Sequence, residues 1–321
     1  MGTTKIEWAE RVWNPVTGCT KVSEGCRNCY AERMAWRLRG RAGYPAHEPF
    51  QATLHPDRLD EPLHWRKPSM VFVCSMGDLF HGDVPDEFIA QVWGVMRSSP
   101  QQIFLVLTKR PERMVRWVNR CHDAESMGWV THDGTPPAKA YDGTGIVVGE
   151  TRRWPLPNVW LGTSVENQNA ANDRIPHLLQ TPAAKRFVSC EPLLGAVDLV
   201  RWLPITYCGQ THYRLVEHEA SDFGPMVFPD WVIVGGESGP GARPMHPDWA
   251  RSLRDQCVAA GVPLFFKQWG EWSPEYPEGM SLAHRAQRYL DGQDFYRVGK
   301  KAAGRLLDGC EWNQTPPKGT S

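Results

Sequence analysis

The sequence predicts an α/β fold, a partial or complete (β/α) TIM-type barrel with parallel strands and loop insertions. Short runs rich in β-branched and aromatic residues recur along the chain, helical segments separate several of them, and polar residues follow each run. Strand, helix, strand units require right-handed crossovers and a parallel sheet, so the choice lies between a barrel and an open doubly wound sheet. Because no segment divides the rhythm into two halves, the sequence favours the barrel.

The predicted strands are apolar on both faces, which is typical of buried parallel strands. We expect a first strand around residues 12–18. Six runs follow it: V-F-V-C-S (71–75), I-F-L-V-L-T (103–108), V-W-L-G-T-S (159–164), R-F-V-S-C (186–190), W-V-I-V-G-G (231–236) and P-L-F-F-K-Q (263–268).

The predicted helices have good helix formers, mixed charge and recognisable ends. The first, over 30–40, begins directly after a cysteine and ends at a glycine, and the last ends in A-G-V-P, where the glycine is a stop signal. The helical segments are 30–40, 86–99, 111–120, 166–180 and 247–260.

We expect one domain over residues 1–321. The alternation of strands and helices is interrupted at 121–157, which is rich in Gly, Pro and Asp, and again at 204–229. We interpret both stretches as insertions on loops. From about residue 272 the chain is polar and glycine-rich, which indicates a C-terminal extension whose last residues, 314–321, fray.

Composition limits the class of protein. The chain has 321 residues and a hydrophobic fraction of 41%, compatible with a sizeable core, and its 36 Lys and Arg balance its 36 Asp and Glu. The balance excludes a global basic field for nucleic acid but leaves room for a local basic patch. No apolar run approaches the roughly 20 residues of a membrane span, and the start lacks a secretory signal. We therefore expect a cytoplasmic protein with no membrane partner.

The stretch G-C-T-K-V-S-E-G-C-R-N-C-Y places Cys19, Cys26 and Cys29 within eleven residues. In a reducing compartment, clustered cysteines are more often metal ligands or catalytic groups than disulfides. A structural zinc ion would need a fourth ligand from elsewhere, such as His81 or Cys74. A [4Fe–4S] cluster held by three thiolates would instead leave one iron open to a substrate or cofactor. Cysteines that merely pack are a third interpretation, which the local density of the triplet disfavours. The spacing leaves the three interpretations open.

Polar residues collect where the predicted strands end. In a parallel barrel these positions share the C-terminal mouth, where active sites are built, so we expect a ring of charges that pair with one another and bind a polar ligand. The candidates are Ser75, Asp78, Thr108, Lys109, Ser164, Glu166, Glu191, Glu237 and Lys267.

The mouth also contains the glycine-dense V-I-V-G-G-E-S-G-P-G-A-R-P (232–244), whose amides could approach a carboxylate or phosphate, although a tight turn explains it equally well. The sequence has no G-x-S-x-G nucleophile elbow and no H-E-x-x-H zinc-binding helix, and these absences argue against a simple hydrolase.

Several motifs carry a resemblance to a known family. The paired cysteines followed by Tyr-Ala at a helix entrance resemble the radical S-adenosylmethionine (SAM) superfamily, and over about 4–270 the chain looks like its phage and prophage three-cysteine-motif branch. One departure is the spacing C-x6-C-x2-C, where the superfamily usually has C-x3-C-x2-C. The motifs are W-N-P-V-T-G-C-T-K-V-S-E-G-C-R-N-C-Y-A-E, S-M-G-D-L-F-H, L-T-K-R-P-E-R-M, L-G-T-S-V-E-N-Q, S-C-E-P-L-L-G, V-G-G-E-S-G-P-G-A-R-P and F-F-K-Q-W-G.

This resemblance implies a [4Fe–4S] cluster on the three cysteines, reductive cleavage of SAM, and an electron donor. It assigns Ser75 and Asp78 to the methionyl group of SAM, and Thr108, Lys109, Ser164 and Glu166 to its ribose and carboxylate. Glu191, Glu237 and Lys267 are then left for the substrate or the radical.

The resemblance also suggests that the substrate is a nucleic acid, a nucleotide or a modified base, and that a phage-encoded protein of this kind acts in the cytoplasm of the host cell. The competing hypothesis is a non-enzymatic, zinc-stapled binding module that acts with phage nucleic-acid machinery. The sequence does not reveal the oligomeric state.

Overall fold

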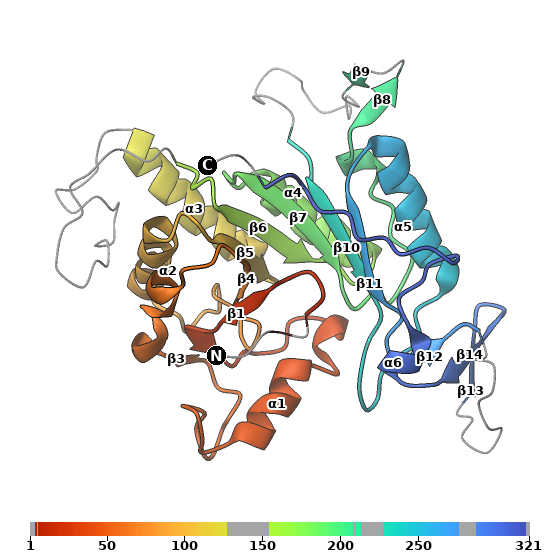
Figure 1. Ribbon diagram of the computed structural model, residues 1–321, viewed down its shortest axis with the longest axis horizontal. Coiled ribbons are helices and arrows are strands. Elements are labelled where there is room, and N and C mark those ends of the chain that lie inside the picture. Colours follow the sequence, from red (N-terminus) through yellow and green to blue (C-terminus); the bar gives the residue numbers. More distant parts are fainter. Residues whose placement is uncertain are drawn as a thin grey trace.

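A seven-stranded parallel sheet forms the centre of the molecule (Figure 1). The computed structural model describes residues 4, 6–126, 154–207, 210–212, 227–275 and 287–318. Along the sheet the strands follow chain order, so each pairs with the previous strand of the sheet. They are β1 (Arg11–Trp13), β4 (Met70–Val73), β5 (Ile103–Thr108), β6 (Val159–Ser164), β7 (Lys185–Cys190), β10 (Trp231–Gly235) and β11 (Leu264–Gln268).

The sheet curls but stays open, which confirms the predicted TIM-type architecture in its partial form. In the described part of the chain β1 and β11 are its two edges. The outer edge of β11 is covered by the C-terminal segment, where Phe265 bridges Asn313 and the Gln314 amide donates to the Leu264 carbonyl at 3.1 Å. Fraying from residue 314 was therefore a wrong prediction for Gln314, because an open strand edge offers it backbone partners.

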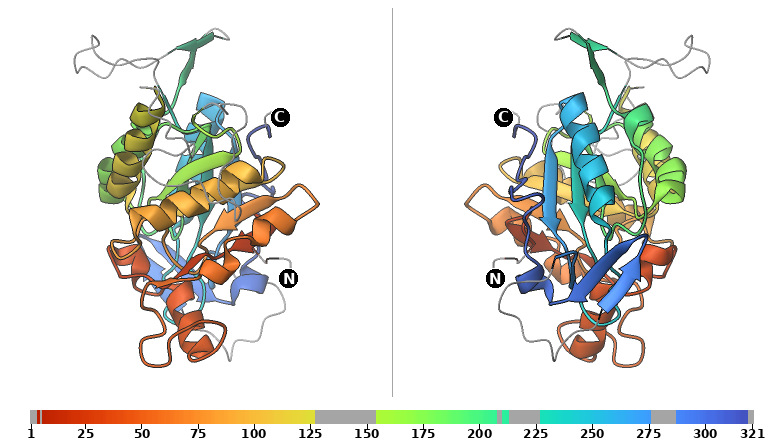
Figure 2. Two further views of the ribbon diagram at one scale, coloured as in Figure 1. Left: turned by 90° about the vertical axis from the view of Figure 1, so that its left-hand side faces the viewer. Right: turned by 90° about the vertical axis from the view of Figure 1, so that its right-hand side faces the viewer.

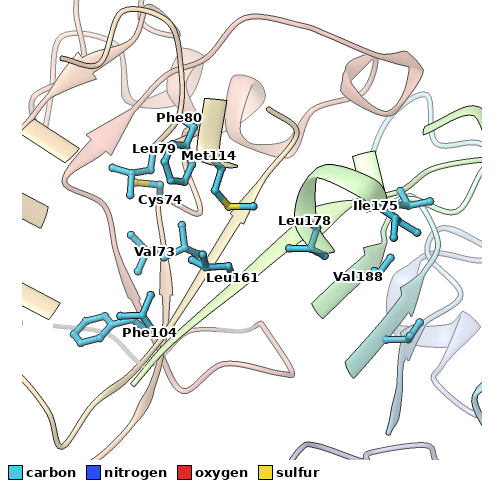
Figure 3. Close-up of a cluster of buried hydrophobic side chains, with 14 of the residues drawn as sticks. Val73, Cys74, Leu79, Phe80, Phe104, Met114, Leu161, Ile175, Leu178 and Val188 are labelled. Atoms are coloured by element: carbon cyan, nitrogen blue, oxygen red, sulfur yellow. The ribbon is translucent and has the colours of Figure 1, made fainter. Parts of the chain in front are cut away.

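Four helices cover one face of the sheet, α2 (Asp86–Ser98), α3 (Pro111–Ser126), α4 (Gln168–Leu179) and α5 (Pro247–Ala260) (Figures 1 and 2). Every second strand residue points toward them, as the two-residue period of a strand requires. Figure 3 shows Val73, Leu161 and Val188 of the strands meeting side chains of α3 and α4 in this core. The predicted helices are therefore confirmed, with α3 six residues longer than expected.

The other face lines the inside of the curl and is filled with large aromatic rings. Trp8, from the N-terminal segment, packs edge-on against Trp231 with ring centroids 6.3 Å apart and an interplanar angle of 89°. Phe187 fills the space that a side chain at position 162 would need, since a Cβ on Gly162 would lie 2.5 Å from its ring. Trp160 and Phe265 complete the layer. The inner face is therefore a packed floor at the amino-terminal part of the strands.

Smaller elements surround this half-barrel. A hairpin pairs β2 (Val16–Thr17) with β3 (Thr53–Leu54), and helix α1 (Tyr30–Leu38) follows β2. The extension predicted from residue 272 contains a three-stranded sheet of β12 (Trp272–Ser273), β14 (Gln293–Arg297) and β13 (Gln287–Leu290), followed by α6 (Lys300–Ala303). The others are β8 (Ile205–Tyr207), β9 (Gln210–His212) and 3-10 turns at Glu24–Cys26, Pro56–Arg58, Glu61–His64 and Val200–Trp202.

The two predicted insertions, 121–157 and 204–229, lie largely outside the described residues, and the single-domain organisation stays a prediction. Among the described helices, none has the length and apolar character needed to cross a membrane.

Candidate functional site

The three cysteines lie on one loop, residues 19–29, which we call the cysteine loop. It leaves β2 at Gly18, whose φ of +81° and close approach to Gln51 exclude a side chain, since a Cβ there would lie 2.0 Å from the Gln51 carbonyl oxygen. The loop ends at Cys29, which occupies the N-cap position of α1. The chain therefore brings the triplet to the end of the strands where the predicted polar residues lie.

The three thiols are free and partly buried. The Cys26 thiol interacts electrostatically with both Cys19 and Cys29. Burial, and then the charge of Asp78, raise the pKa of Cys19 to about 11 against the opposing effect of Arg110. Burial likewise raises the pKa of Cys29. Because a thiolate and not a thiol binds metal, a cation would have to displace these protons, which couples metal binding to proton release.

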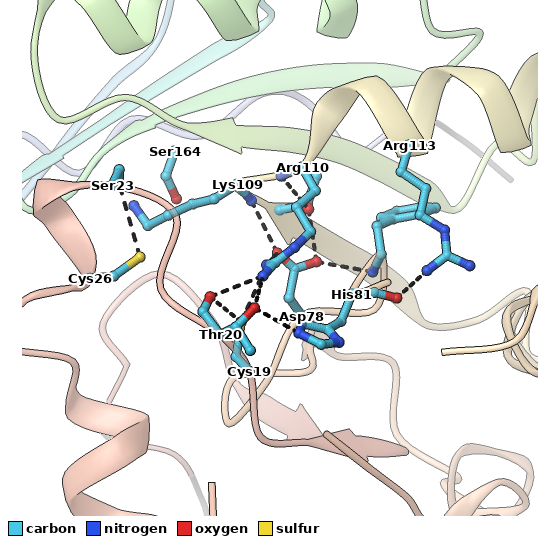
Figure 4. A network of polar contacts seen from close by, with 12 residues as sticks. Cys19, Thr20, Ser23, Cys26, Asp78, His81, Lys109, Arg110, Arg113 and Ser164 are labelled. Atoms are coloured by element: carbon cyan, nitrogen blue, oxygen red, sulfur yellow. Dashed lines mark hydrogen bonds and ion pairs between the residues drawn. The ribbon is translucent and has the colours of Figure 1, made fainter. Parts of the chain in front are cut away.

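Asp78, after β4, holds the start of the cysteine loop through Arg110, after β5 (Figure 4). Its carboxylate accepts hydrogen bonds from the Thr108 hydroxyl at 2.8 Å and from Arg110 Nη1 at 3.1 Å. Arg110 in turn donates to Cys19 Sγ at 3.2 Å and to the Thr20 carbonyl at 2.9 Å. Charge-assisted bonds of this kind are short and directional, so they fix the first cysteine.

Glu166, after β6, holds the middle of the loop. It is 1% exposed and accepts hydrogen bonds from the Ser23 hydroxyl, from Lys109 Nζ at 3.4 Å and from Arg174 Nη1 at 2.6 Å. Burial alone would raise the pKa of Glu166, but the charges of Lys109 and Arg174 outweigh it and lower the pKa. Gly25 packs directly on this carboxylate.

Glu237, after β10, holds the end of the loop. One carboxylate oxygen accepts from Asn28 Nδ2 at 3.0 Å and from the Arg243 amide at 2.8 Å, and the other accepts from Arg243 Nη2 at 2.8 Å. Arg243 also donates to the Glu24 carbonyl at 2.9 Å. Part of the glycine-dense stretch therefore holds the segment between Cys26 and Cys29 in place. Gly241 lacks a side chain and so leaves room for the side chain of Asn28.

The other predicted site residues divide into two groups. Ser75 donates to Asn14 Oδ1 at 3.2 Å, and Ser164 lies buried at the end of β6, near Lys109 in Figure 4. Glu191 and Lys267 form a separate ion pair at 2.5 Å that spans β7 and β11, and both side chains are 16% exposed. A Cβ at Gly235, on the strand between them, would lie 2.9 Å from Glu191 Cγ.

Both candidates for a fourth zinc ligand are already engaged. His81 Nε2 shares a 2.9 Å hydrogen bond with the Thr20 hydroxyl, and His81 Nδ1 accepts from the Asp83 amide at 3.2 Å. Cys74 is 2% exposed and packs in the apolar core, where burial strongly raises the pKa of its thiol (Figure 3).

The sequence predictions omitted the residues that connect the strand ends to the loop. These are Ser23, Asn28 and Arg243, to which Arg174 is added because it holds Glu166, while Arg110 directly follows the candidate Lys109. Two of them carried a local signal, because Asn28 sits between two cysteines and Arg243 closes the glycine-dense motif. Arg174 lies inside a helix and carried none.

Fold and site together define an open (β/α) half-barrel with a three-cysteine loop held at the carboxyl ends of its strands. The chain belongs to the family described as "Protein of unknown function (DUF5131)", whose model matches residues 3–316. No curated protein sequence matches it.

Solved structures similar to this chain include two of spore photoproduct lyase. One is a mutant of that enzyme in which serine replaces a cysteine, with a TM-score of 0.35 and 10% identity. The other is its complex with a dinucleoside spore photoproduct, with a TM-score of 0.33 and 9% identity. Each match covers 94% of this chain and 71% of the other.

Proposed function

We propose that this protein is a radical SAM enzyme, in which Cys19, Cys26 and Cys29 hold a [4Fe–4S] cluster. The observation that supports this most strongly is the convergence of three strand-end carboxylates on the cysteine loop. A fold that only needed a stable turn would not require charged groups from β4, β6 and β10 to hold it. Groups that orient metal ligands from behind are a regular part of metal centres.

The donor set fits a group that takes three protein ligands. The Cys26 thiol interacts electrostatically with the Cys19 and Cys29 thiols, while His81 and Cys74 are committed to other contacts. A structural zinc ion would need a fourth protein ligand, whereas a [4Fe–4S] cluster on three thiolates keeps one iron for an exogenous ligand. When reduced, such a cluster supplies one electron that cleaves SAM into methionine and a 5′-deoxyadenosyl radical.

Within this proposal the strand-end residues have different tasks. The side chains of Asp78, Thr108, Glu166 and Glu237 each make two or more hydrogen bonds to neighbouring protein groups, so we assign them to positioning the cysteine loop. Ser75 and Lys109 each make one such side-chain bond, so we keep direct contact with SAM for these two and for Ser164. The Lys109 ammonium, 18% exposed, is suited to a carboxylate.

The Glu191 and Lys267 pair is independent of the loop and faces the substrate in this proposal. It offers one carboxylate and one ammonium for binding, or for moving a proton. The partners are SAM, an electron donor and a nucleotide or nucleic-acid substrate, in the cytoplasm.

The test is anaerobic purification, iron reconstitution, and reduction with dithionite in the presence of SAM. We expect a brown protein that releases 5′-deoxyadenosine, measured by chromatography. The Cys26→Ala variant should lose iron and product while it stays folded, since Cys26 is not in the core. Cys310→Ala, which removes an exposed thiol, is the matched control and should retain both.

Stoichiometric zinc without iron, together with no 5′-deoxyadenosine, would refute the enzyme and support the zinc-stapled module. Unfolding of Cys26→Ala would favour a structural metal as well, because loss of a structural zinc site removes folding free energy.

A further inference from the structure

Positive charge is concentrated on the cysteine loop and α1, although the whole chain is neutral. Residues 19–41 contain six basic side chains and two acidic ones, whereas the chain as a whole has 36 of each sign. Figure 1 shows α1 standing apart from the four helices that cover the sheet. The charge therefore lies on a projecting part of the molecule.

The two acidic residues of this segment are already paired. Glu24 binds Arg243 at 3.1 Å and Glu32 binds Lys21 at 3.0 Å. Within the described ranges, by contrast, Arg27, Arg37, Arg39 and Arg41 are exposed and make no ion pair. Four guanidinium groups are thus available to an external anion.

Two aromatic rings are exposed on the same helix. Tyr30 is 63% and Trp36 is 50% exposed, although most of the described tryptophans are buried. They lie six positions apart in the chain, which corresponds to about 9 Å along a helix axis. Large exposed rings on the same segment as arginines that make no ion pair are unusual on a surface with no partner, because both are enriched where proteins bind ligands.

We propose that this α1 surface, formed by Arg27, Tyr30, Trp36, Arg37, Arg39 and Arg41, binds single-stranded nucleic acid. The arginines would contact phosphates and the two rings would stack on bases, which is the combination that recognises single strands. Since Tyr30 follows Cys29 directly, a bound strand passes next to the cysteine loop. Binding of this kind needs no electron transfer, so it does not depend on the proposed radical chemistry.

The test is fluorescence anisotropy of a labelled short oligo-dT strand and an oligo-U strand with the 321-residue protein, at several salt concentrations. Replacing both rings, Tyr30→Ser with Trp36→Ser, should weaken binding by roughly 5- to 150-fold for each base that loses its stacking partner. Replacing Arg37, Arg39 and Arg41 by Gln should reduce the slope of log K against log salt by about 2, at about 0.7 for each lost phosphate contact.

The matched control is Arg66→Gln with Arg116→Gln, which removes exposed charges elsewhere. It should bind like the parent protein, and circular dichroism should be unchanged in all variants. Equal weakening by the control, no binding of either strand, or binding to anionic lipid vesicles with neither strand bound would overturn the proposal. Loss of 5′-deoxyadenosine production with strand binding intact would count against the radical enzyme alone.

Discussion

Asp78, Glu166 and Glu237 are alike at the level of single residues, because both oxygens of each carboxylate accept hydrogen bonds from the protein. Buried carboxylates of this kind are expensive to leave unpaired and strongly directional when paired. Substitutions at their partners should therefore act on the cysteines and leave most of the half-barrel unaffected.

Arg110→Gln should lower the affinity of the cysteine loop for iron by roughly 10- to 100-fold, the usual cost of losing a group that orients metal ligands. The change removes the donor to Cys19 Sγ and to the Thr20 carbonyl. Iron content after reconstitution at limiting iron measures it. Arg116→Gln, on the exposed side of α3, should load iron like the parent protein, and equal loading of the two variants would contradict the assignment.

Gly25→Ala tests the contact between the loop and Glu166. A Cβ at this position would lie 2.6 Å from Glu166 Oε1, and Glu166 has little freedom to move because Arg174 and Lys109 hold it. We expect reduced iron loading with a small change in melting temperature. Gly82→Ala, where a Cβ would meet nothing within 4 Å, is the control, and a parent-like Gly25→Ala would show that the loop tolerates displacement.

At the level of elements, the connection between β10 and α5 holds the cysteine loop through Glu237, which binds Asn28, and Arg243, which binds Glu24. Arg243 and Asn28 lower the pKa of Glu237 in spite of its burial, which alone would raise it. A carboxylate with a lowered pKa in the folded state stabilises the protein above its unfolded pKa, near 4.5, and this contribution fades as pH falls towards the folded pKa.

Glu237→Gln should therefore destabilise the protein near neutral pH, by about 1.5–3 kcal/mol for a lost bond to a charged partner. The difference from the parent protein should shrink as pH falls below 4.5. Urea unfolding at a series of pH values measures it. A difference that stays constant across the series would mean that Glu237 stabilises by packing and not by charge.

The elements show what could be predicted from the sequence and what could not. Six of the seven strands of the main sheet and four of the five expected helices were predicted within a few residues, because their apolar periodicity is local, as in 103–108 and 247–260. The strand expected around 12–18 is instead the end of β1 followed by β2 of the hairpin. The same alternation of strands and helices predicted that Asp78 and Glu237 lie at strand ends. Their tasks did not, because the Asn28 contact to Glu237 joins positions 209 residues apart and depends on the curl of the whole sheet.

At the scale of the whole molecule, the packed floor and the candidate site occupy opposite ends of the inner face. Trp231, Trp160 and Phe187 pack the floor, while the mouth holds the charged groups. This division is the one expected of α/β barrels, in which the carboxyl-terminal end of the strands carries the chemistry. Changes in the floor should therefore act on folding first.

Trp231→Ala should lower the free energy of unfolding by about 3–5 kcal/mol, the usual cost of removing a large buried ring. The ring is fully buried, and its Nε1 donates to the Gln314 carbonyl at 2.8 Å, which also ties down the C-terminal segment. Chemical denaturation measures the loss. Trp36→Ala removes the same ring from the surface and should change stability by less than about 0.5 kcal/mol, and similar losses in both would refute the packed floor.

The cysteine loop is held from three places that are far apart in the chain, after β4 and β5, after β6, and after β10. The last of these strands docks on β7, so the loop reaches its final shape after nearly the whole sheet has assembled. A nascent or truncated chain therefore presents its thiols on an unconstrained segment. A group that binds tightly at this loop would therefore bind after synthesis and folding are complete. Earlier binding is disfavoured because an incomplete sheet does not hold the three thiols in place.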